Sequence, residues 1–376
     1  MNPLQKLREF GQSVWYDNIE RRLLENGELA RMIAEDGILG LTSNPTIFEK
    51  AIGGSHDYDS EITELAAQGA AVEQTYETLA IADIRRACDL LRPVFESSNR
   101  LDGYASLEVS PHLALDTEGT IAAGKRLFAT VDRPNLMIKV PGTPEGVPAI
   151  EALIASGINV NVTLLFAVPA YEAAARAYIR GLDRLAAAGG DVSRVASVAS
   201  FFVSRIDGSA DKRIEAVIAA SDDVALCEHL RNLLGKIAVA NSKMAYARFE
   251  EIFAEPAFQP LRANGARVQR MLWASTSTKN PVYPDTLYVD PLIGPDTVNT
   301  MPQATIDAYL DHGQPQAGAV RSGLDQARAH FASLAAAGIS LDEITSELLV
   351  QGVASFSASY DKLLSVIANK MAKLAA

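Results

Sequence analysis

Short apolar runs alternate along this chain with longer segments in which apolar residues recur every three or four positions. The short runs are rich in β-branched and aromatic residues, as buried strands are, and the longer segments have the period of amphipathic helices. Near-continuous apolar strands that alternate with helices indicate a parallel sheet covered on both faces. The eight strands predicted in this way lie at residues 13–19, 37–44, 103–110, 135–141, 158–166, 194–206, 270–276 and 285–290.

Clear helical patterns lie between several of these strands. The predicted helices are 72–92, 117–131, 143–157 and 168–190. We expect Thr117 and Thr143 to cap two of them, because a side-chain hydroxyl accepts a hydrogen bond from the first helical turn. Pro144 would then occupy the first helical position of its helix, where its missing N–H costs nothing.

The eight strand–helix units predict an α/β fold of the (β/α)8 TIM barrel type, over about residues 12–302. A doubly wound sheet is the competing fold, but no G-x-G-x-x-G motif follows the first strand. Additional helices are expected at 210–260, between the sixth and seventh strands, and in a C-terminal helical region at 303–376. No linker rich in Ser, Gly or Pro divides the chain, so we expect one decorated domain over residues 1–376.

Composition narrows the classes of function. The 376 residues are 48% hydrophobic and 21% charged, as in ordinary globular proteins. A formal net charge of -12 excludes a general nucleic-acid partner, which needs a broad basic face, but allows a small phosphorylated ligand. No apolar stretch predicts a membrane span, and the N-terminal segment lacks the apolar core of a signal peptide. We therefore expect a cytoplasmic protein, for which a monomer and a homodimer are both compatible with the sequence.

The most informative positions are polar residues near the C-terminal ends of the apolar strands, where barrel enzymes build their active sites. Lys139 interrupts the apolar fourth strand. Burial there favours the neutral amine, which attacks carbonyl carbons and forms a Schiff base. The alternative is an ammonium group that pairs with a barrel carboxylate or reaches out at the strand end. The sequence alone leaves both interpretations open.

Two carboxylates occupy comparable positions, Glu108 on the third strand and Asp17 on the first. Glu108 is either an ion-pair partner of Lys139 or a group that holds water or moves a proton. Asp17 is either an acid–base group or, slightly favoured by the local pattern, the N-cap of the following helix. Asn44 and Thr163, taken singly, are explained as an ordinary turn residue and an ordinary strand residue.

Two cations at strand ends suggest an anion site. Arg205, with Ser200 nearby, can bind a phosphate in bidentate fashion or form an ion pair with Asp207. Lys279 follows four hydroxyl residues, Ser275–Thr278, which either line an anion pocket or form a polar loop. Barrel topology would bring these strand ends together around one mouth.

Several other chemistries lack their usual residues. The five histidines are scattered without metal-ligand spacing, so we expect no metal ion. No P-loop, dinucleotide fingerprint or G-x-S-x-G motif occurs, and we expect no cofactor. Cys88 and Cys227 lie in predicted helices and should be buried free thiols. Covalent lysine chemistry is what remains.

The chain as a whole resembles the transaldolase family, most closely its longer bacterial branch. The motifs that carry the resemblance are GLTSNPTIFEKAI (40–52), ASLEVSP (105–111), NLMIKVPGTPEG (135–146), INVNVTLLF (158–166), ASFFVSRID (199–207), WASTSTKNP (273–281) and YVDPLIGPDTVNTMP (288–302). The resemblance implies a (β/α)8 barrel and a class I, Schiff-base mechanism. It implies that Lys139 forms the Schiff base, that Asp17 exchanges the proton of a sugar hydroxyl, and that Glu108, Thr163 and Asn44 organise the catalytic water.

For the substrate, the resemblance implies that Ser200 contacts the sugar, that Arg205 binds its phosphate, and that Phe202 lies beside them. One departure concerns the second phosphate contact. Many transaldolases place an arginine after the seventh strand, where this chain has the run ASTSTKN. Lys279, with Ser275 nearby, is expected to take its place.

The implied activity is transfer of a dihydroxyacetone unit in the non-oxidative pentose phosphate pathway. The donor would be sedoheptulose 7-phosphate or fructose 6-phosphate, and the acceptor glyceraldehyde 3-phosphate or erythrose 4-phosphate. One alternative is a simple class I aldolase that releases dihydroxyacetone to solvent. Another is a barrel that binds sugar phosphate without turnover, although the presence of Lys139, Glu108 and Asp17 argues against it.

Overall fold

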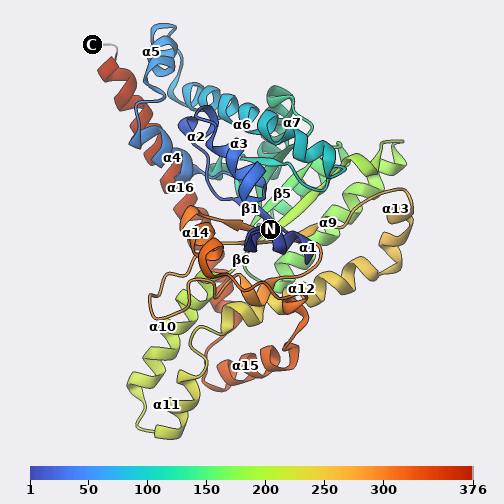
Figure 1. The fold of residues 1–376 in the computed structure, drawn as a ribbon, viewed down its shortest axis with the longest axis vertical. Coiled ribbons are helices and arrows are strands. Elements are labelled where there is room, and N and C mark those ends of the chain that lie inside the picture. The colour runs from blue at the N-terminus through green and yellow to red at the C-terminus, as the bar shows by residue number, and fades with distance from the viewer. Residues whose placement is uncertain (375–376) are drawn as a thin grey trace.

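The protein folds as a closed barrel of eight parallel strands surrounded by helices (Figure 1). The computed structural model describes residues 1–374. Neighbouring strands pair in chain order, and β1 pairs with β8 to close the ring, which confirms the predicted (β/α)8 fold. The strands are β1 Gln12–Tyr16, β2 Ile38–Thr42, β3 Ala105–Glu108, β4 Leu136–Pro141, β5 Val160–Leu165, β6 Ser197–Phe202, β7 Arg270–Ala274 and β8 Thr297–Met301.

The prediction of an eighth strand at 285–290 is wrong. That segment forms turns that lead into a short 3₁₀ helix, and the true β8 follows at Thr297–Met301. β8 carries polar side chains that find partners inside the barrel, such as the Thr300 hydroxyl, which lies 2.7 Å from that of Thr42. Polar groups satisfied in this way are tolerated in a core, so a search for apolar runs passes over such a strand.

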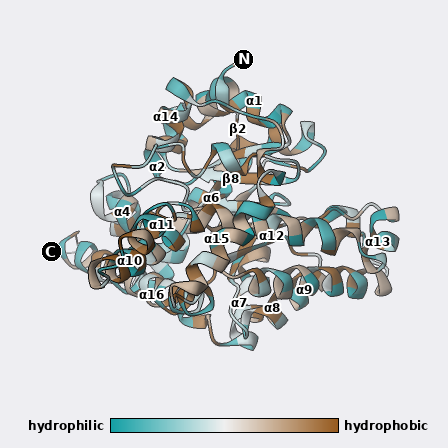
Figure 2. Cartoon of the chain, turned by 90° about the horizontal axis from the view of Figure 1, so that it is seen from below, coloured by the Kyte–Doolittle hydropathy of each residue, from teal (hydrophilic) through white to brown (hydrophobic). Residues whose placement is uncertain are grey.

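Amphipathic helices cover the outside of the barrel, and in Figure 2 they alternate between hydrophobic and hydrophilic colours along their length. The predicted helices at 72–92, 117–131 and 168–190 are confirmed as α6, α7 and α9. The helices that precede β6 are α1 Pro3–Glu9, α2 Arg21–Glu25, α3 Glu28–Arg31, α4 Pro45–Gly54, α5 Asp59–Ala67, α6 Val72–Ser97, α7 Thr117–Val131, α8 Gly146–Ala155 and α9 Val168–Ala187.

Both predicted helix caps are wrong in detail. Asp116 rather than Thr117 caps α7, because its carboxylate accepts a hydrogen bond from the first turn at 2.9 Å. α8 begins at Gly146 rather than at Pro144, after a turn. Thr143 still contributes there, since its hydroxyl accepts a hydrogen bond from the Gly146 N–H at 3.0 Å.

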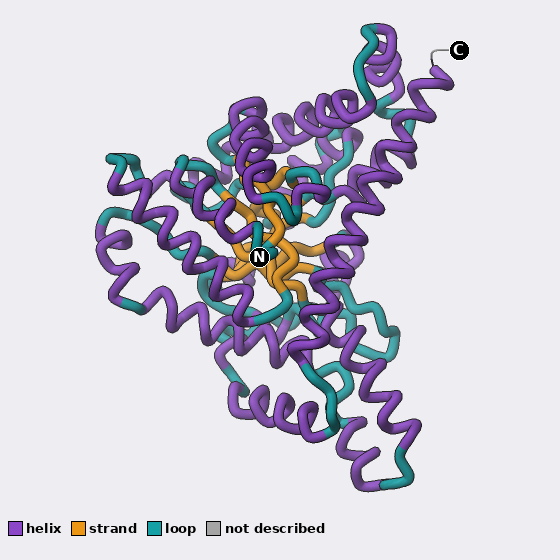
Figure 3. The backbone as a smooth tube through the Cα atoms, turned by 180° about the vertical axis from the view of Figure 1, so that it is seen from behind, coloured by secondary structure: helices purple, strands orange, loops and turns teal. Residues whose placement is uncertain are grey.

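Further helices extend the barrel at the two expected places, and Figure 3 shows the strands enclosed by helices on all sides. Figure 1 shows α10 and α11 reaching away from the barrel, while α16 runs beside α4. α16 also contacts α5, α6, α10 and β5, so this long helix spans one end of the barrel. The helices after β6 are α10 Ser204–Ala220, α11 Val224–Arg231, α12 Ile237–Ala254, α13 Gln259–Ala263, α14 Gln303–His312, α15 Leu324–Ala336 and α16 Leu341–Leu374.

Three further features concern the described part of the chain, residues 1–374. None of its helices combines the length and the apolar character needed to cross a membrane. No group of three or more His, Cys, Asp or Glu side chains is arranged there to hold a metal ion. Cys88 and Cys227 are buried free thiols, as expected, and burial raises the pKa of Cys88 to about 12.

A buried ion pair closes the N-terminal end of the barrel. Arg270 Nη1 lies 3.0 Å from Asp102 Oδ1, and both side chains are almost fully buried. Asp102 also accepts hydrogen bonds from Ser13 at 2.7 Å and from the Trp15 indole at 3.1 Å. The network therefore ties β1 and β7 to the loop that precedes β3.

We expect Asp102→Ala to lower the free energy of unfolding by about 3–5 kcal/mol, because Arg270 stays buried without a counter-charge. Urea denaturation followed by circular dichroism measures the loss. The double variant Asp102→Leu/Arg270→Met should recover much of it, since no charge is then buried. A single variant as stable as the parent protein would contradict this account.

Candidate active site

The C-terminal ends of the strands surround a cavity of about 330 Å³, which we call the substrate cavity. Nine of the ten residues singled out from the sequence line it. They are Asp17, Asn44, Lys139, Thr163, Ser200, Phe202, Arg205, Ser275 and Lys279. The tenth, Glu108, does not line this cavity but lies directly behind Lys139. The fold thus brings together side chains from six strands, as barrel topology requires.

Lys139 lies on β4 with its side chain only 6% exposed. Its Nζ atom donates a hydrogen bond to the Ser43 carbonyl at 3.1 Å and lies 3.4 Å from Glu108 Oε2. The Phe356 ring of α16 covers it, with 5.8 Å between Nζ and the ring centre. The ion pair considered as an alternative is therefore present, and the amine also faces the substrate cavity. Such an arrangement suits a lysine that exchanges a proton with a carboxylate before it attacks a carbonyl.

Glu108 ends β3 and is almost fully buried. Burial raises the pKa of this carboxyl to about 7, and the neighbouring Lys139 ammonium opposes the rise. Neither carboxylate oxygen has a hydrogen-bond partner among the described protein atoms. A carboxyl group with a pKa near 7 can both give and take a proton at neutral pH.

Asp17 follows β1 directly, and its N–H donates to the Met301 carbonyl of β8 at 2.9 Å. Its carboxylate accepts a hydrogen bond from the Thr42 hydroxyl at 2.7 Å. Burial raises the pKa of Asp17, while the nearby Lys139 and the Thr42 hydrogen bond oppose the rise. The N-cap interpretation is wrong, because α2 begins only after Glu20. Asp17 is a fixed carboxylate at the cavity wall.

Asn44 and Thr163 both line the cavity, Asn44 from the start of a helix and Thr163 from a strand. Asn44 is the N-cap of α4, where its Oδ1 accepts a hydrogen bond from the Ile47 N–H at 3.0 Å. The Thr163 hydroxyl is buried and has no partner among the described protein atoms. The next residue, Leu164, has a left-handed φ of 59°, and the register of β5 against β6 shifts there. A bulky residue in this conformation is strained, and such strain concentrates at functional sites.

The opposite side of the cavity carries the anion-binding candidates. Arg205 lies in the first turn of α10, with its guanidinium 5.1 Å from the centre of the Phe202 ring. The alternative considered for Arg205, an ion pair with Asp207, is not formed, because that carboxylate instead accepts hydrogen bonds from the Ala238 N–H and the Tyr288 hydroxyl. Among residues 1–374, Arg205 therefore has no carboxylate partner within 4.0 Å, and it lines the substrate cavity.

Two serines support this side of the cavity. The Ser200 hydroxyl donates to Asn161 Oδ1 at 2.7 Å, which orients it on β6. Ser275 has a left-handed φ of 56°, and its hydroxyl lies 3.0 Å from that of Ser204. Lys279 is exposed at the rim and donates to Ser277 at 2.5 Å.

The cavity also contains residues that the sequence interpretation missed. Lys50 on α4 is a further cation at the rim, and Phe356 enters from α16. In the sequence, a lysine on an amphipathic helix cannot be told apart from an ordinary solvent-exposed lysine. Phe356 lies in a C-terminal helix whose position over the barrel depends on tertiary contacts. Thr42 and Thr300 line the cavity as well, and threonine is an ordinary strand residue.

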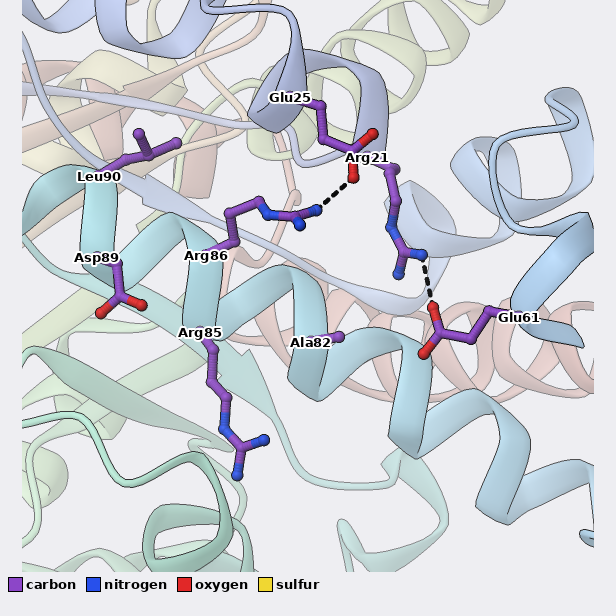
Figure 4. A pocket seen from close by; sticks show the side chains of 8 residues that line it. All are labelled: Arg21, Glu25, Glu61, Ala82, Arg85, Arg86, Asp89 and Leu90. Atoms are coloured by element: carbon purple, nitrogen blue, oxygen red, sulfur yellow. Dashed lines mark hydrogen bonds and ion pairs between the residues drawn. The ribbon is translucent and has the colours of Figure 1, made fainter. Parts of the chain in front are cut away.

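Unpaired cations distinguish this cavity from a larger pocket on the outside of the barrel, of about 520 Å³ (Figure 4). In the outer pocket, Arg21 pairs with Glu61 and Arg86 pairs with Glu25. In the substrate cavity, by contrast, no carboxylate of residues 1–374 lies within 4.0 Å of the charged nitrogens of the rim cations. Those cations are Lys50, Arg205 and Lys279. The outer pocket also holds Arg85, which donates to the carbonyl groups of Thr130 and Val131. Three cations without a carboxylate neighbour therefore gather at the substrate cavity, whereas two of the three arginines of the outer pocket are neutralised.

Comparison with known proteins agrees with this geometry. The sequence profile of the transaldolase/fructose-6-phosphate aldolase family matches residues 14–367. The chain belongs to this family. The match begins within β1 and ends within α16, and it includes all of β2 to β8. The recognition of a transaldolase from the sequence motifs is thus confirmed.

Curated transaldolases are similar to the chain over almost its whole length. "Transaldolase 2" of Nostoc sp. (strain PCC 7120) is 48% identical over 99% of this chain and 98% of its own. The "Transaldolase" of Thiobacillus denitrificans is 49% identical over 98% of this chain and 100% of its own. The "Transaldolase" of Thermobifida fusca is 47% identical over 99% of both chains. Transaldolases are transferases that act on sugar phosphates through a lysine Schiff base. The chain is a member of this enzyme family.

Proposed function

We propose that Lys139 is the Schiff-base lysine of a transaldolase that moves a dihydroxyacetone unit between sugar phosphates. The donor is sedoheptulose 7-phosphate or fructose 6-phosphate, and the acceptor is glyceraldehyde 3-phosphate or erythrose 4-phosphate. One observation carries the proposal: a buried amine 3.4 Å from a carboxyl group faces a cavity whose rim holds unpaired cations. The enzyme works as one decorated domain in the cytoplasm, as a monomer or homodimer.

The reaction begins when the neutral Lys139 amine attacks the C2 carbonyl of the ketose. Glu108 donates a proton to the departing hydroxyl, water leaves, and a protonated imine forms. Asp17 then takes the proton of the C4 hydroxyl. The C3–C4 bond breaks, its electron pair moves into the imine, and an aldose phosphate leaves. The dihydroxyacetone unit remains on Lys139 as an enamine.

The second half of the reaction reverses these steps. C3 of the enamine attacks the aldehyde carbon of the acceptor, and Asp17 returns its proton to the new hydroxyl. Glu108 then takes a proton from the water that hydrolyses the imine, with Asn44 and Thr163 orienting water on the cavity side. The product ketose phosphate leaves, and Lys139 is free again.

Arg205 holds the substrate phosphate, with Lys279 as the second cation. We expect Arg205→Ala to raise KM for fructose 6-phosphate at least tenfold, because a charge-assisted bidentate contact contributes on the order of 1.5–3 kcal/mol. Cleavage of unphosphorylated fructose should change little. Arg213→Ala is the matched control, since Arg213 lies on the same helix but pairs with Glu347 away from the cavity. Equal losses with both sugars would contradict the role of Arg205.

The most direct test of the whole proposal is transfer activity with fructose 6-phosphate and erythrose 4-phosphate in the presence of a metal chelator. Borohydride added with fructose 6-phosphate should attach a stable three-carbon or six-carbon label to Lys139. Free dihydroxyacetone in the absence of an acceptor would instead indicate a simple aldolase. Binding without any trapped imine would indicate a barrel that only binds sugar phosphate.

A further inference from the structure

The two cations expected to bind the substrate phosphate lie on different elements. Arg205 lies in the first turn of α10, whereas Lys279 lies in the loop between β7 and β8, residues 275–296. The only regular element of this β7–β8 loop is a short 3₁₀ helix at Asp290–Leu292. A lysine carries a compact charge on a flexible stem, so its backbone must be brought close to the group that it binds. The loop must therefore be held near α10 if both cations are to bind one phosphate.

A groove of about 800 Å³, which we call the loop groove, lies between the β7–β8 loop, α10 and α16. It adjoins the substrate cavity, because Arg205, Ser275 and Lys279 line both spaces. Tyr283 and Tyr288 of the loop also line the groove. Since open space lies between the loop and α10 there, the hydrogen bonds that join the two elements become important for the position of the loop.

Two tyrosines of the loop make these hydrogen bonds. The Tyr283 hydroxyl donates to Asp211 Oδ2 at 2.8 Å, and the Tyr288 hydroxyl donates to Asp207 Oδ2 at 3.0 Å. Asp207 and Asp211 are four residues apart and so lie on one face of α10. Each carboxylate also accepts a backbone N–H from the chain around the start of α12, at 2.7 Å for Asp207 and 3.1 Å for Asp211. The two carboxylates are therefore fixed anchors for the loop.

A compact turn links one of these tyrosines to the lysine. The Thr278 hydroxyl donates to the Pro284 carbonyl at 2.9 Å, and the Tyr283 N–H donates to the Asn280 carbonyl at 3.1 Å. Lys279 and Tyr283 both lie within the segment that these bonds close. A displacement of the Tyr283 ring therefore also displaces Lys279.

We propose that Tyr283, held by Asp211, is a positioning residue that sets the distance between Lys279 and Arg205, so that both cations bind the phosphate of one sugar. Helix α10 then places both charges. It carries Arg205 on its own backbone, and it fixes Lys279 through the hydrogen bond between Asp211 and Tyr283. The inference rests on the phosphate-binding role proposed above for the two cations.

Tyr283→Phe tests this role, because it removes the hydroxyl and keeps the ring. We expect KM for fructose 6-phosphate to rise about fivefold, as for the loss of one hydrogen bond, with kcat changed less than twofold. Cleavage of unphosphorylated fructose should keep the parent rate. Tyr309→Phe is the matched control, since Tyr309 also donates to an aspartate, Asp290, at 2.9 Å. It lies on α14 and lines neither the loop groove nor the substrate cavity, so its variant should keep the parent KM.

A double-variant cycle separates positioning from a general structural role. Lys279→Ala should itself raise KM for fructose 6-phosphate about fivefold or more. Adding Tyr283→Phe to Lys279→Ala should raise KM no further, because the tyrosine acts through the lysine. A parent KM in either single variant would overturn the proposal, as would effects that multiply in the double variant or an equal loss with unphosphorylated fructose. Absence of transfer and of any trapped imine in the parent protein would instead overturn the Schiff-base function.

Discussion

Replacing Lys139 with methionine is expected to abolish transfer, with kcat/KM falling by about 10⁴-fold or more. The Nζ atom forms the bond to the ketose, and no binding or acid–base group in the cavity can substitute for that bond. Methionine keeps the length and apolar packing of the side chain, and Glu108, left without its counter-charge, takes up a proton. The barrel should therefore fold. Coupled transfer from fructose 6-phosphate to erythrose 4-phosphate measures the activity, and mass spectrometry after borohydride treatment locates the label.

Lys243 offers the matched control, since it is the other buried lysine in the described chain. Its Nζ atom donates to the carbonyl oxygens of Ala319 at 3.1 Å and Ser322 at 2.8 Å, and it does not line the substrate cavity. Lys243→Met should keep kcat and the labelling of Lys139, at some cost in stability. A label on Lys243, or full activity in Lys139→Met, would refute the assignment.

Glu108→Gln is expected to lower kcat by about 10²–10³-fold, because the amide can neither give nor take a proton during imine formation and hydrolysis. Trapping with borohydride should show that imine formation becomes slow, while KM changes little, since Glu108 lies behind Lys139 and outside the substrate cavity. Glu151→Gln is a suitable control, because Glu151 pairs with Arg180 on the surface and does not line the substrate cavity. A loss confined to KM would contradict the assigned role.

The same substitution should stabilise the protein above neutral pH. Burial raises the Glu108 pKa from 4.5 to about 7, so the folded state holds this proton more tightly than the unfolded state. The resulting stability is complete below pH 4.5 and is lost as the pH rises through about 7. At about 1.4 kcal/mol per unit, the difference is roughly 3 kcal/mol. Urea denaturation at pH 5 and pH 8 should show this loss in the parent protein but not in Glu108→Gln. Parallel behaviour of the two proteins would contradict it.

Local pattern was sufficient to predict most of the barrel and of the candidate site. Seven of the eight strands were predicted because they are near-continuous apolar runs buried on both faces. Polar residues at the ends of those runs stand out for the same reason, and Lys139, Asp17 and Arg205 all line the substrate cavity. β8 was missed because it carries polar side chains. Thr300 and Asn299 find their partners on β2 and in the loop after β7, an arrangement that depends on the closed barrel.

The sequence by itself determined the fold class, the family and the residue types at the barrel mouth, because strand periodicity and motif order are local properties of the chain. Tertiary structure alone decided where those residues lie relative to the substrate cavity and to one another. It placed Glu108 behind Lys139 and left Arg205 without a carboxylate partner among residues 1–374. It also laid α16 across the mouth of the barrel, so that Phe356 lines the substrate cavity. These arrangements arise from packing between segments that are distant along the chain. No local pattern records which face of a helix such packing buries.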